Sequence, residues 1–411
     1  MLTAEEIIQK KKQYFYPNTM HFYRNPPHIV KGEGKYLFDD KGKQYLDFFA
    51  GVTVVNCGHC NPEITERVCE QVKRLQHTSI IYLTEPMVEL AERLAKILPG
   101  DIHQVFFCNS GSEANDGALQ LARMKTGKKG FLAFKGGLHG RTTLTLAVTG
   151  IPMWRIDPFL DDEPVWFAEG FSNIDESLQS VEDILNAHGG EISACIVEPV
   201  QGNGGINVPP PDFFIRLKRL LEKHNVLLIF DEIQTGFGRL GYMFAAEYFN
   251  VVPDIISFAK ALGNGTPIGA FAARPDTAAA LNKPSSSTLG GNPVSMTAGL
   301  AALDFIEKNG LCATSRELGV YFLEQLRAIE KDFQSLIAGV RGLGLMLGVS
   351  MNDPLHVDIV LEKMKDEGII IGKNGMNREV IAFQPPLIID KDDISLVCSA
   401  FRGALSSLKG K

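Results

Sequence analysis

Residues 212–231 read DFFIRLKRLLEKHNVLLIFD, and this stretch joins a helix pattern to a strand pattern. In residues 212–224 the apolar side chains recur at helical spacing: Phe213, Phe214, Leu217, Leu220 and Leu221. Asp212 follows three prolines and is placed to cap that helix. Residues 226–230 are continuously apolar, as expected for a strand buried on both faces. The stretch therefore predicts a helix that leads directly into a buried strand.

The same kind of apolar run recurs at residues 194–197 and 255–258. Short buried strands that alternate with helices predict an α/β fold with a mostly parallel sheet. The chain termini differ, because residues 36–49 predict a hairpin around Asp40-Lys41-Gly42. The C-terminal part predicts long helices, such as 391–405, with short strands near 344–350 and 379–383. We therefore expect a large domain over 58–299 and a smaller α+β domain built by 1–57 and 300–411.

The composition is that of a globular protein with mild acidity. Of 411 residues, 45% are hydrophobic and 22% charged, which excludes disordered, collagen-like and coiled-coil classes. A net charge of −7 without a basic block argues against nucleic acid as a partner. No apolar stretch has the length of a membrane span, and the N-terminus lacks the apolar core of an export signal. Seven scattered cysteines are expected to be reduced thiols in a cytoplasmic protein.

Three predicted strands end on an ionisable residue: Glu198, Asp231 and Lys260. Ligands of open parallel sheets bind beyond the carboxyl ends of the strands. One such charge is usually only the point where the chain meets water, but three of opposite sign indicate a ligand crevice. A lysine beside a carboxylate in a partly dry crevice can serve as a nucleophile.

A further element, Asn109-Ser-Gly-Ser-Glu-Ala-Asn115, follows the apolar run 105–108 and precedes a helix pattern. Free amides at such a helix N-terminus can hold a phosphate, although any helix can begin with a capping serine. The element is not a Walker A loop, since no Gly-Lys in the chain is followed by Ser or Thr. A lysine, a carboxylate and a phosphate cradle together suit pyridoxal phosphate best.

The chain also resembles the class III pyridoxal-phosphate-dependent aminotransferases of the fold type I superfamily. The resemblance covers nearly the whole chain and rests on eight ordered motifs. They are Tyr45-Leu-Asp47, Gly58-His59 with Asn61-Pro62, Asn109 to Asn115, His139-Gly-Arg141, Glu198-Pro-Val-Gln-Gly202, Asp231 to Arg239, Ser257-Phe-Ala-Lys-Ala-Leu-Gly263, and Thr288-Leu-Gly-Gly-Asn-Pro293.

The resemblance implies two catalytic residues. Lys260 would form the Schiff base with the cofactor and carry the proton, and Asp231 would pair with the pyridinium nitrogen. Gln234 would hydrogen-bond the ring hydroxyl, and Ile233 would pack on one ring face. Thr288 would reach the phosphate of a neighbouring subunit, which implies a homodimer. The other residues that it places around the cofactor are Ser110, Gly111, Ser112, Leu138, His139 and Glu198.

Three departures from the family pattern concern the ring and the substrate. Leu138 stands where an aromatic residue usually stacks on the cofactor. Asn203 and Ala382 replace a glutamate and an arginine that normally pair, and the arginine grips a substrate carboxylate. Arg378 is close in sequence, and we expect it to be a solvated surface residue. Unless another arginine, such as Arg141 or Arg378, binds the substrate carboxylate instead, the two replacements predict a donor with a terminal amine. Such a donor is an ω-amino acid, an amino sulfonate or phosphonate, or a simple amine, with pyruvate as acceptor.

Other signals are weaker, and other functions stay open. Cys57-Gly-His-Cys60 matches a disulfide-oxidoreductase motif but lies inside a segment that the family resemblance explains. Residues 342–348 miss a dinucleotide fingerprint and predict a closely packed strand, and no histidine precedes a glutamate as in a HExxH zinc site. A lyase or racemase would use the same cofactor. A catalytically silent cofactor-binding or scaffold protein would not need to keep both Lys260 and Asp231.

Overall fold

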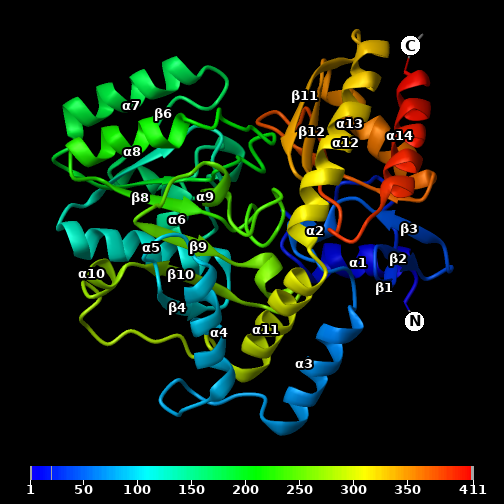
Figure 1. The fold of residues 1–411 in the computed structure, drawn as a ribbon. Helices are drawn as coiled ribbons and strands as arrows, with labels where there is room; N and C mark the ends of the chain where they lie inside the picture. Colours follow the sequence, from blue (N-terminus) through cyan, green and yellow to red (C-terminus); the bar gives the residue numbers. More distant parts are fainter. Residues whose placement is uncertain (1, 20, 409–411) are drawn as a thin grey trace.

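The computed structural model describes residues 2–19 and 21–408, and a seven-stranded sheet lies at its centre (Figure 1). Six strands are parallel to one another, and β10 runs antiparallel between β4 and β9. In spatial order the strands are β4 (Gln104–Cys108), β10 (Gly269–Ala273), β9 (Ile255–Phe258), β8 (Leu227–Asp231), β7 (Ile192–Val197), β5 (Gly130–Phe134) and β6 (Val165–Ala168). The predicted α/β class with a mostly parallel sheet is confirmed.

Helices cover both faces of this sheet, which explains why its strands are continuously apolar. Alternate residues of β7 join different cores: Ala194 and Ile196 pack with helix α5 (Gly111–Thr126), whereas Cys195 and Val197 belong to the larger core. That larger core includes apolar residues of α7 (Ile174–His188) and α8 (Phe213–Lys223). Figure 1 shows α7 and α8 on one side of the sheet and α5 on the other.

Asp212 occupies the N-cap position of α8, but its side chain makes no capping hydrogen bond. The predicted N-cap position is therefore confirmed, although the side chain does not bond the helix amides. A capping side chain turns back onto the helix from an extended residue, whereas Asp212 has near-helical dihedral angles (φ −87°, ψ −7°).

Three helices form a layer beside the η3 turn (Lys260–Gly263), where α11 (Pro293–Lys308) packs on α3 (Pro62–Arg74) and α4 (Glu85–Ile97). Shorter helices connect the remaining strands of the large sheet. They are α6 (Thr143–Ala147), α9 (Ala245–Tyr248), α10 (Pro275–Ala278), η1 (Pro152–Trp154) and η2 (Leu160–Asp162).

The two chain ends build two further four-stranded sheets. The predicted hairpin forms from β2 (Tyr36–Asp39) and β3 (Gln44–Asp47), and Gly42 takes the positive φ (+81°) of its turn. One sheet has the order β1 (Ile29–Glu33), β2, β3 and β13 (Ile369–Ile370). The other has the order β11 (Ile337–Leu343), β12 (Met346–Met351), β15 (Val380–Phe383) and β14 (Gly372–Asn374). β3 comes from the N-terminal part of the chain and β13 from the C-terminal part, and the two strands pair. We therefore keep our proposal of a large domain over 58–299 and a smaller domain over 1–57 and 300–411.

Residues 342–348 form not one strand but the end of β11, a turn at Gly344-Leu345 and the start of β12, so the prediction of a single strand is wrong. Gly344 has φ +54°, and a Cβ there would lie 2.5 Å from the Leu240 carbonyl carbon. Only glycine combines that dihedral angle with so close an approach.

Long helices cover the C-terminal sheet, as predicted. They are α12 (Leu311–Asp332), α13 (Pro354–Asp366) and α14 (Lys391–Ser406). At the N-terminus, α1 (Ala4–Tyr14) begins with a Thr3–Glu6 capping box and buries no residue. The short α2 (Ala50–Thr53) contains left-handed residues. Among the residues that the structure describes, no helix is both long and apolar enough to cross a membrane.

Candidate active site

The carboxyl ends of β7, β8 and β9 meet at one cavity of about 220 Å³, and Glu198, Asp231 and Lys260 all line it. Ten of the eleven predicted site residues line this cavity. They are Ser110, Gly111, Ser112, Leu138, His139, Glu198, Asp231, Ile233, Gln234 and Lys260. Thr288 is exposed and does not line the cavity of its own chain. Distant segments of the sequence therefore converge where the parallel sheet predicts a ligand.

Both oxygens of the Asp231 carboxylate are held in place. Asn115 Nδ2 donates to Oδ2 at 2.8 Å, His139 Nδ1 lies 2.8 Å from the same oxygen, and the Ile233 amide donates to Oδ1 at 3.1 Å. Asn115 is itself fixed by Ser257, whose hydroxyl donates to Asn115 Oδ1. The carboxylate is therefore buried but pre-oriented, ready for a cationic partner.

The contacts of His139 determine which ring nitrogen carries its proton. A carboxylate can only accept, so Nδ1 donates to Asp231. Nε2 is buried and has no partner. Asp231 thus has one hydrogen-bonded imidazole neighbour and also lines the cavity, where a cationic group of a ligand can pair with it.

The Lys260 side chain faces the cavity from a strained backbone. Its φ is +44°, and no hydrogen bond or ion pair of its amine is found within the described part of the chain. Burial lowers the pKa of Lys260, while the charges of Asp231 and Glu198 act in the opposite direction. A lowered pKa raises the neutral fraction of the amine, which is the nucleophilic form. Strain at a non-glycine residue is common at functional sites.

Glu198 lines the cavity and contacts the 138–141 loop. Its carboxylate accepts from the amides of Leu138 (2.8 Å) and Gly202 (3.0 Å). Burial and the nearby Asp231 raise the pKa of Glu198 to about 7. Glu198 therefore fixes the backbone on both sides of the cavity, and its charge depends on what binds there.

The N-terminus of α5 borders the cavity. The Ser110 hydroxyl accepts from the Glu113 amide and caps the helix. The other amides of the first helical turn have no intrahelical partners, as at any helix N-terminus. A Cβ on Gly111 would lie 2.7 Å from Ile233 Cδ1, so glycine is needed for this close approach. Free amides and the positive end of the helix dipole favour an anion here.

These residues fit pyridoxal phosphate. The oriented Asp231 can pair with a pyridinium, and the α5 N-terminus can hold a phosphate. The unpartnered Lys260 amine is available for the covalent link. No group of three or more His, Cys, Asp or Glu residues in the described chain could hold a metal ion.

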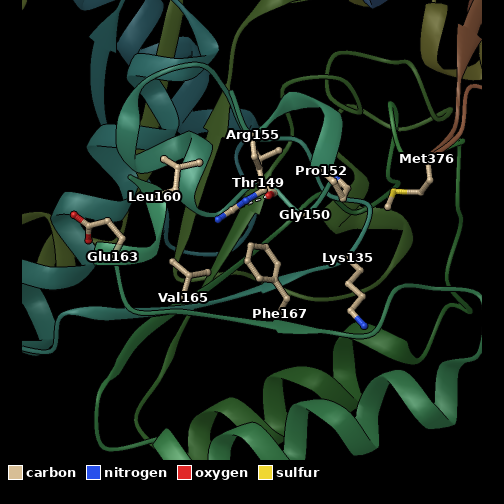
Figure 2. A pocket seen from close by; sticks show the side chains of 10 residues that line it. All are labelled: Lys135, Thr149, Gly150, Pro152, Arg155, Leu160, Glu163, Val165, Phe167 and Met376. Atoms are coloured by element: carbon tan, nitrogen blue, oxygen red, sulfur yellow. Dashed lines mark hydrogen bonds between the residues drawn. The ribbon is translucent and has the colours of Figure 1, made fainter. Parts of the chain in front are cut away.

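A larger cavity of about 480 Å³ lies near this site, and Figure 2 shows its side chains. Its walls are mainly apolar, with Leu160, Val165 and Phe167 among them. Its charged side chains are already engaged: Lys135 with Glu169, Glu163 with Arg123, and Arg155 with the carbonyl groups of Leu146, Ala147 and Thr149. It offers no free nucleophile or acid, so we assign the chemistry to the smaller cavity.

The three departures from the family pattern have clear positions. Leu138 lines the cavity, and Asn203 lies in the turn beside it, where its carbonyl accepts from the Gly375 amide. Ala382 is fully buried in β15. Arg378 is half-buried rather than solvated, which corrects our expectation, because its guanidinium stacks 5.2 Å from the centre of the Phe22 ring.

The sequence did not single out every residue of the site. Gly140 also lines the cavity, and Asn115 orients Asp231. Arg141, which the sequence offered as an alternative partner for a substrate carboxylate, lines the cavity as well. Asn115 was visible only as a letter of a motif, since nothing in a linear pattern indicates which neighbour it contacts. In the Cys57–Cys60 motif, burial raises the pKa of Cys57 to about 12, which disfavours a reactive thiolate.

The chain is similar to known aminotransferases. The family model described as Aminotransferase class-III matches residues 20–405. The chain is 41% identical to an acetylornithine aminotransferase of Archaeoglobus fulgidus, over 89% of this chain and 92% of that protein. It is 38% identical to alanine–glyoxylate aminotransferase 2 homolog 2 (mitochondrial) of Arabidopsis thaliana, over 99% of this chain and 88% of that protein. The structure of a phospholyase from Arthrobacter, in complex with phosphoethanolamine, superposes with a TM-score of 0.89 at 28% identity, covering 98% of this chain and 99% of that one.

Proposed function

The chain belongs to the class III aminotransferase family, whose members depend on pyridoxal phosphate, and we propose that it transfers a terminal amino group to pyruvate. The donor would be an ω-amino acid, an amino sulfonate or phosphonate, or a simple amine. The observation that carries this proposal is the site itself: Lys260 and Asp231 line one cavity, and Ala382, fully buried in β15, replaces the family's carboxylate-binding arginine.

Each residue of the cavity has a proposed task. The bound cofactor supplies an electron sink for the carbon that carries the amino group. Lys260 would hold the cofactor and move a proton at that carbon, and Asp231 would keep the ring nitrogen protonated. Ile233 and Leu138 would exclude water from the ring. Gly111 and Ser112 would hold the phosphate with backbone amides.

The surroundings of position 382 support a donor without an α-carboxylate. Ala382 pairs with Gly348 on one side and Gly372 on the other, so its row of the sheet presents no charge there. Arg341 pairs with Gly348 and extends the same row, but its guanidinium donates to the Ser350 hydroxyl. Arg141 does line the cavity, so its charge is available to the distal acidic group of an ω-amino acid, sulfonate or phosphonate.

A panel of amino donors tests this proposal. With pyruvate as acceptor, terminal-amine donors should exceed glutamate in kcat/KM by roughly 10- to 100-fold, the effect of one charge-assisted contact of about 1.5–3 kcal/mol. The panel is repeated with 2-oxoglutarate, which should be the poorer acceptor. Glutamate as the best donor would overturn the proposal.

A lyase is the second candidate, because one structural relative is a phospholyase bound to phosphoethanolamine. The two reactions differ in their need for an acceptor. A lyase releases ammonia from its substrate when no oxo acid is present, whereas transamination stops after one equivalent of donor per site. Ammonia release without pyruvate, measured on the same donor panel, would favour the lyase over our proposal.

We also propose a homodimer in the cytoplasm, in which Thr288 contacts the cofactor phosphate of the neighbouring subunit. Thr288 is exposed and lies outside its own cavity. All seven cysteines are free thiols, which suits a reducing compartment.

Dilution to monomers should weaken cofactor binding by roughly 10- to 100-fold, because one hydrogen bond to a charged phosphate is lost. Thr288→Ala in the dimer should have a similar effect. Ser286→Ala, at an exposed position two residues away, serves as the matched control. Sedimentation combined with cofactor titration measures both quantities, and a monomer with full cofactor affinity would contradict the shared site.

A further inference from the structure

Gln384, at the end of β15, is a fully buried polar residue that the proposed reaction does not use. Its Nε2 donates to Oε1 of Gln234 in a hydrogen bond of 3.4 Å. Its own Oε1 is buried and has no partner among the described residues. An unpaired buried amide oxygen destabilises the fold, so an apolar side chain would pack better here. Fold stability therefore does not explain why residue 384 carries a side-chain amide.

The contact with Gln234 provides that explanation. Gln234 lines the active-site cavity, whereas Gln384 lies behind it. A glutamine amide has a donor end and an acceptor end, and its surroundings decide which end faces which way. Because Gln384 donates to Oε1 of Gln234, the Nε2 donor of Gln234 is left for the cavity. Gly202 confines the same amide, since a Cβ there would lie 2.6 Å from both Oε1 and Nε2.

The backbone around Gln384 is firmly anchored. The Gln384 amide donates to the Phe48 carbonyl at 2.8 Å, and the next carbonyl, that of Pro385, accepts from Arg239 at 2.6 Å. Arg239 is fully buried and also donates to Asn56 and to the Leu345 carbonyl. It lies in the same segment as Asp231 and Gln234. The two glutamine side chains are therefore held from both ends rather than brought together by chance.

We propose that Gln384 is a positioning residue, which turns the Gln234 amide so that its N–H points at the ring oxygen of the cofactor. This inference rests on the proposed function, because it needs the ring to lie above Gln234. A donor at that oxygen favours its anionic form and holds the ring in place. Without Gln384, the Gln234 amide can rotate and present its oxygen instead.

The test is Gln384→Met, which keeps the volume and removes the donor. The pKa read from the visible absorbance of the bound cofactor should rise by roughly 0.5–1 unit, which is about a 3- to 10-fold change in proton affinity. Cofactor affinity, measured by titrating apoenzyme, should fall by a similar factor. Gln71→Met is the matched control, since Gln71 is also buried but lies on α3 and donates to the Leu75 carbonyl.

A double-mutant cycle with Gln234→Met separates positioning from a general loss of packing. If Gln384 acts through Gln234, Gln384→Met should have no further effect on the absorbance titration in the Gln234→Met background. An equal shift in both backgrounds, or a shift in Gln71→Met, would overturn the inference. Gln384→Leu provides a second variant should the methionine not pack.

The experiments distinguish a failure of this inference from a failure of the proposed function. If the wild-type protein lacks a visible absorbance that depends on Lys260, the proposed function fails. If the wild type has that absorbance and transfers amino groups while Gln384→Met titrates like the wild type, only the role of Gln384 is wrong.

Discussion

Lys260→Ala is expected to remove the visible absorbance of the bound cofactor and to lower kcat/KM by at least about 10²- to 10⁴-fold. The reason is that the amine of Lys260 faces the cavity without a partner and with a lowered pKa. It is placed both to bind the cofactor and to move the proton at the substrate carbon. Absorbance spectra and steady-state kinetics on the purified variant measure the two effects, and a small primary amine added to the buffer should restore part of the rate.

Lys128→Ala is the matched control. The Lys128 amine donates to three backbone carbonyls, those of Gly189, His224 and Asn225, away from the active-site cavity. Its loss should lower the melting temperature but leave the absorbance and the rate per folded molecule unchanged. A Lys260→Ala protein with wild-type absorbance and turnover would show that Lys260 is not the cofactor lysine.

Asp231→Asn is expected to lower kcat/KM by roughly 10- to 100-fold while the fold is kept. Asparagine retains the shape and can still accept from Asn115 or the Ile233 amide, but it has no charge to hold the ring nitrogen protonated. A hydrogen bond to a charged group contributes about 1.5–3 kcal/mol, which sets the expected factor.

Asp254→Asn serves as the comparison for this variant. Asp254 is also buried, accepts from the Leu228 amide and pairs with Arg274. It lies at the amino end of β9, whereas the active site lies at the carboxyl end of that strand. Asp254→Asn should lower the free energy of unfolding and leave kcat/KM unchanged. If Asp231→Asn turns over at the wild-type rate, the ring nitrogen does not depend on Asp231. If both variants lose activity to the same degree, the effect is structural.

Local patterns were sufficient for the elements of the large sheet. The run at 226–230 became β8, and the helix at 212–224 became α8, because burial on both faces and a helical apolar stripe are properties of neighbouring residues. The pattern also located Asp212 at the N-cap of α8, but not the absence of a capping hydrogen bond from its side chain. That bond depends on the dihedral angles of one residue, which the side-chain pattern does not specify.

Turns and surface assignments were less predictable. Residues 342–348 alternate in size like a strand, yet they fold back at Gly344, because Leu240 approaches the backbone there. Arg378 looked like a surface residue, but the Phe22 ring from the other end of the chain covers it. Both outcomes depend on a partner more than 100 residues away, and such a partner leaves no local signal.

By itself, the sequence determined the α/β class and the strand ends that carry Glu198, Asp231 and Lys260, because strand burial and motif letters are local. Only the tertiary structure decided how these residues are held: the contact of His139 with Asp231, the orientation of Asp231 by Asn115, and the contact of Gln384 with Gln234. Each of these depends on an angle and a distance between segments that the fold brings together. Hydrogen-bond direction is a property of such pairs, and no single segment encodes it.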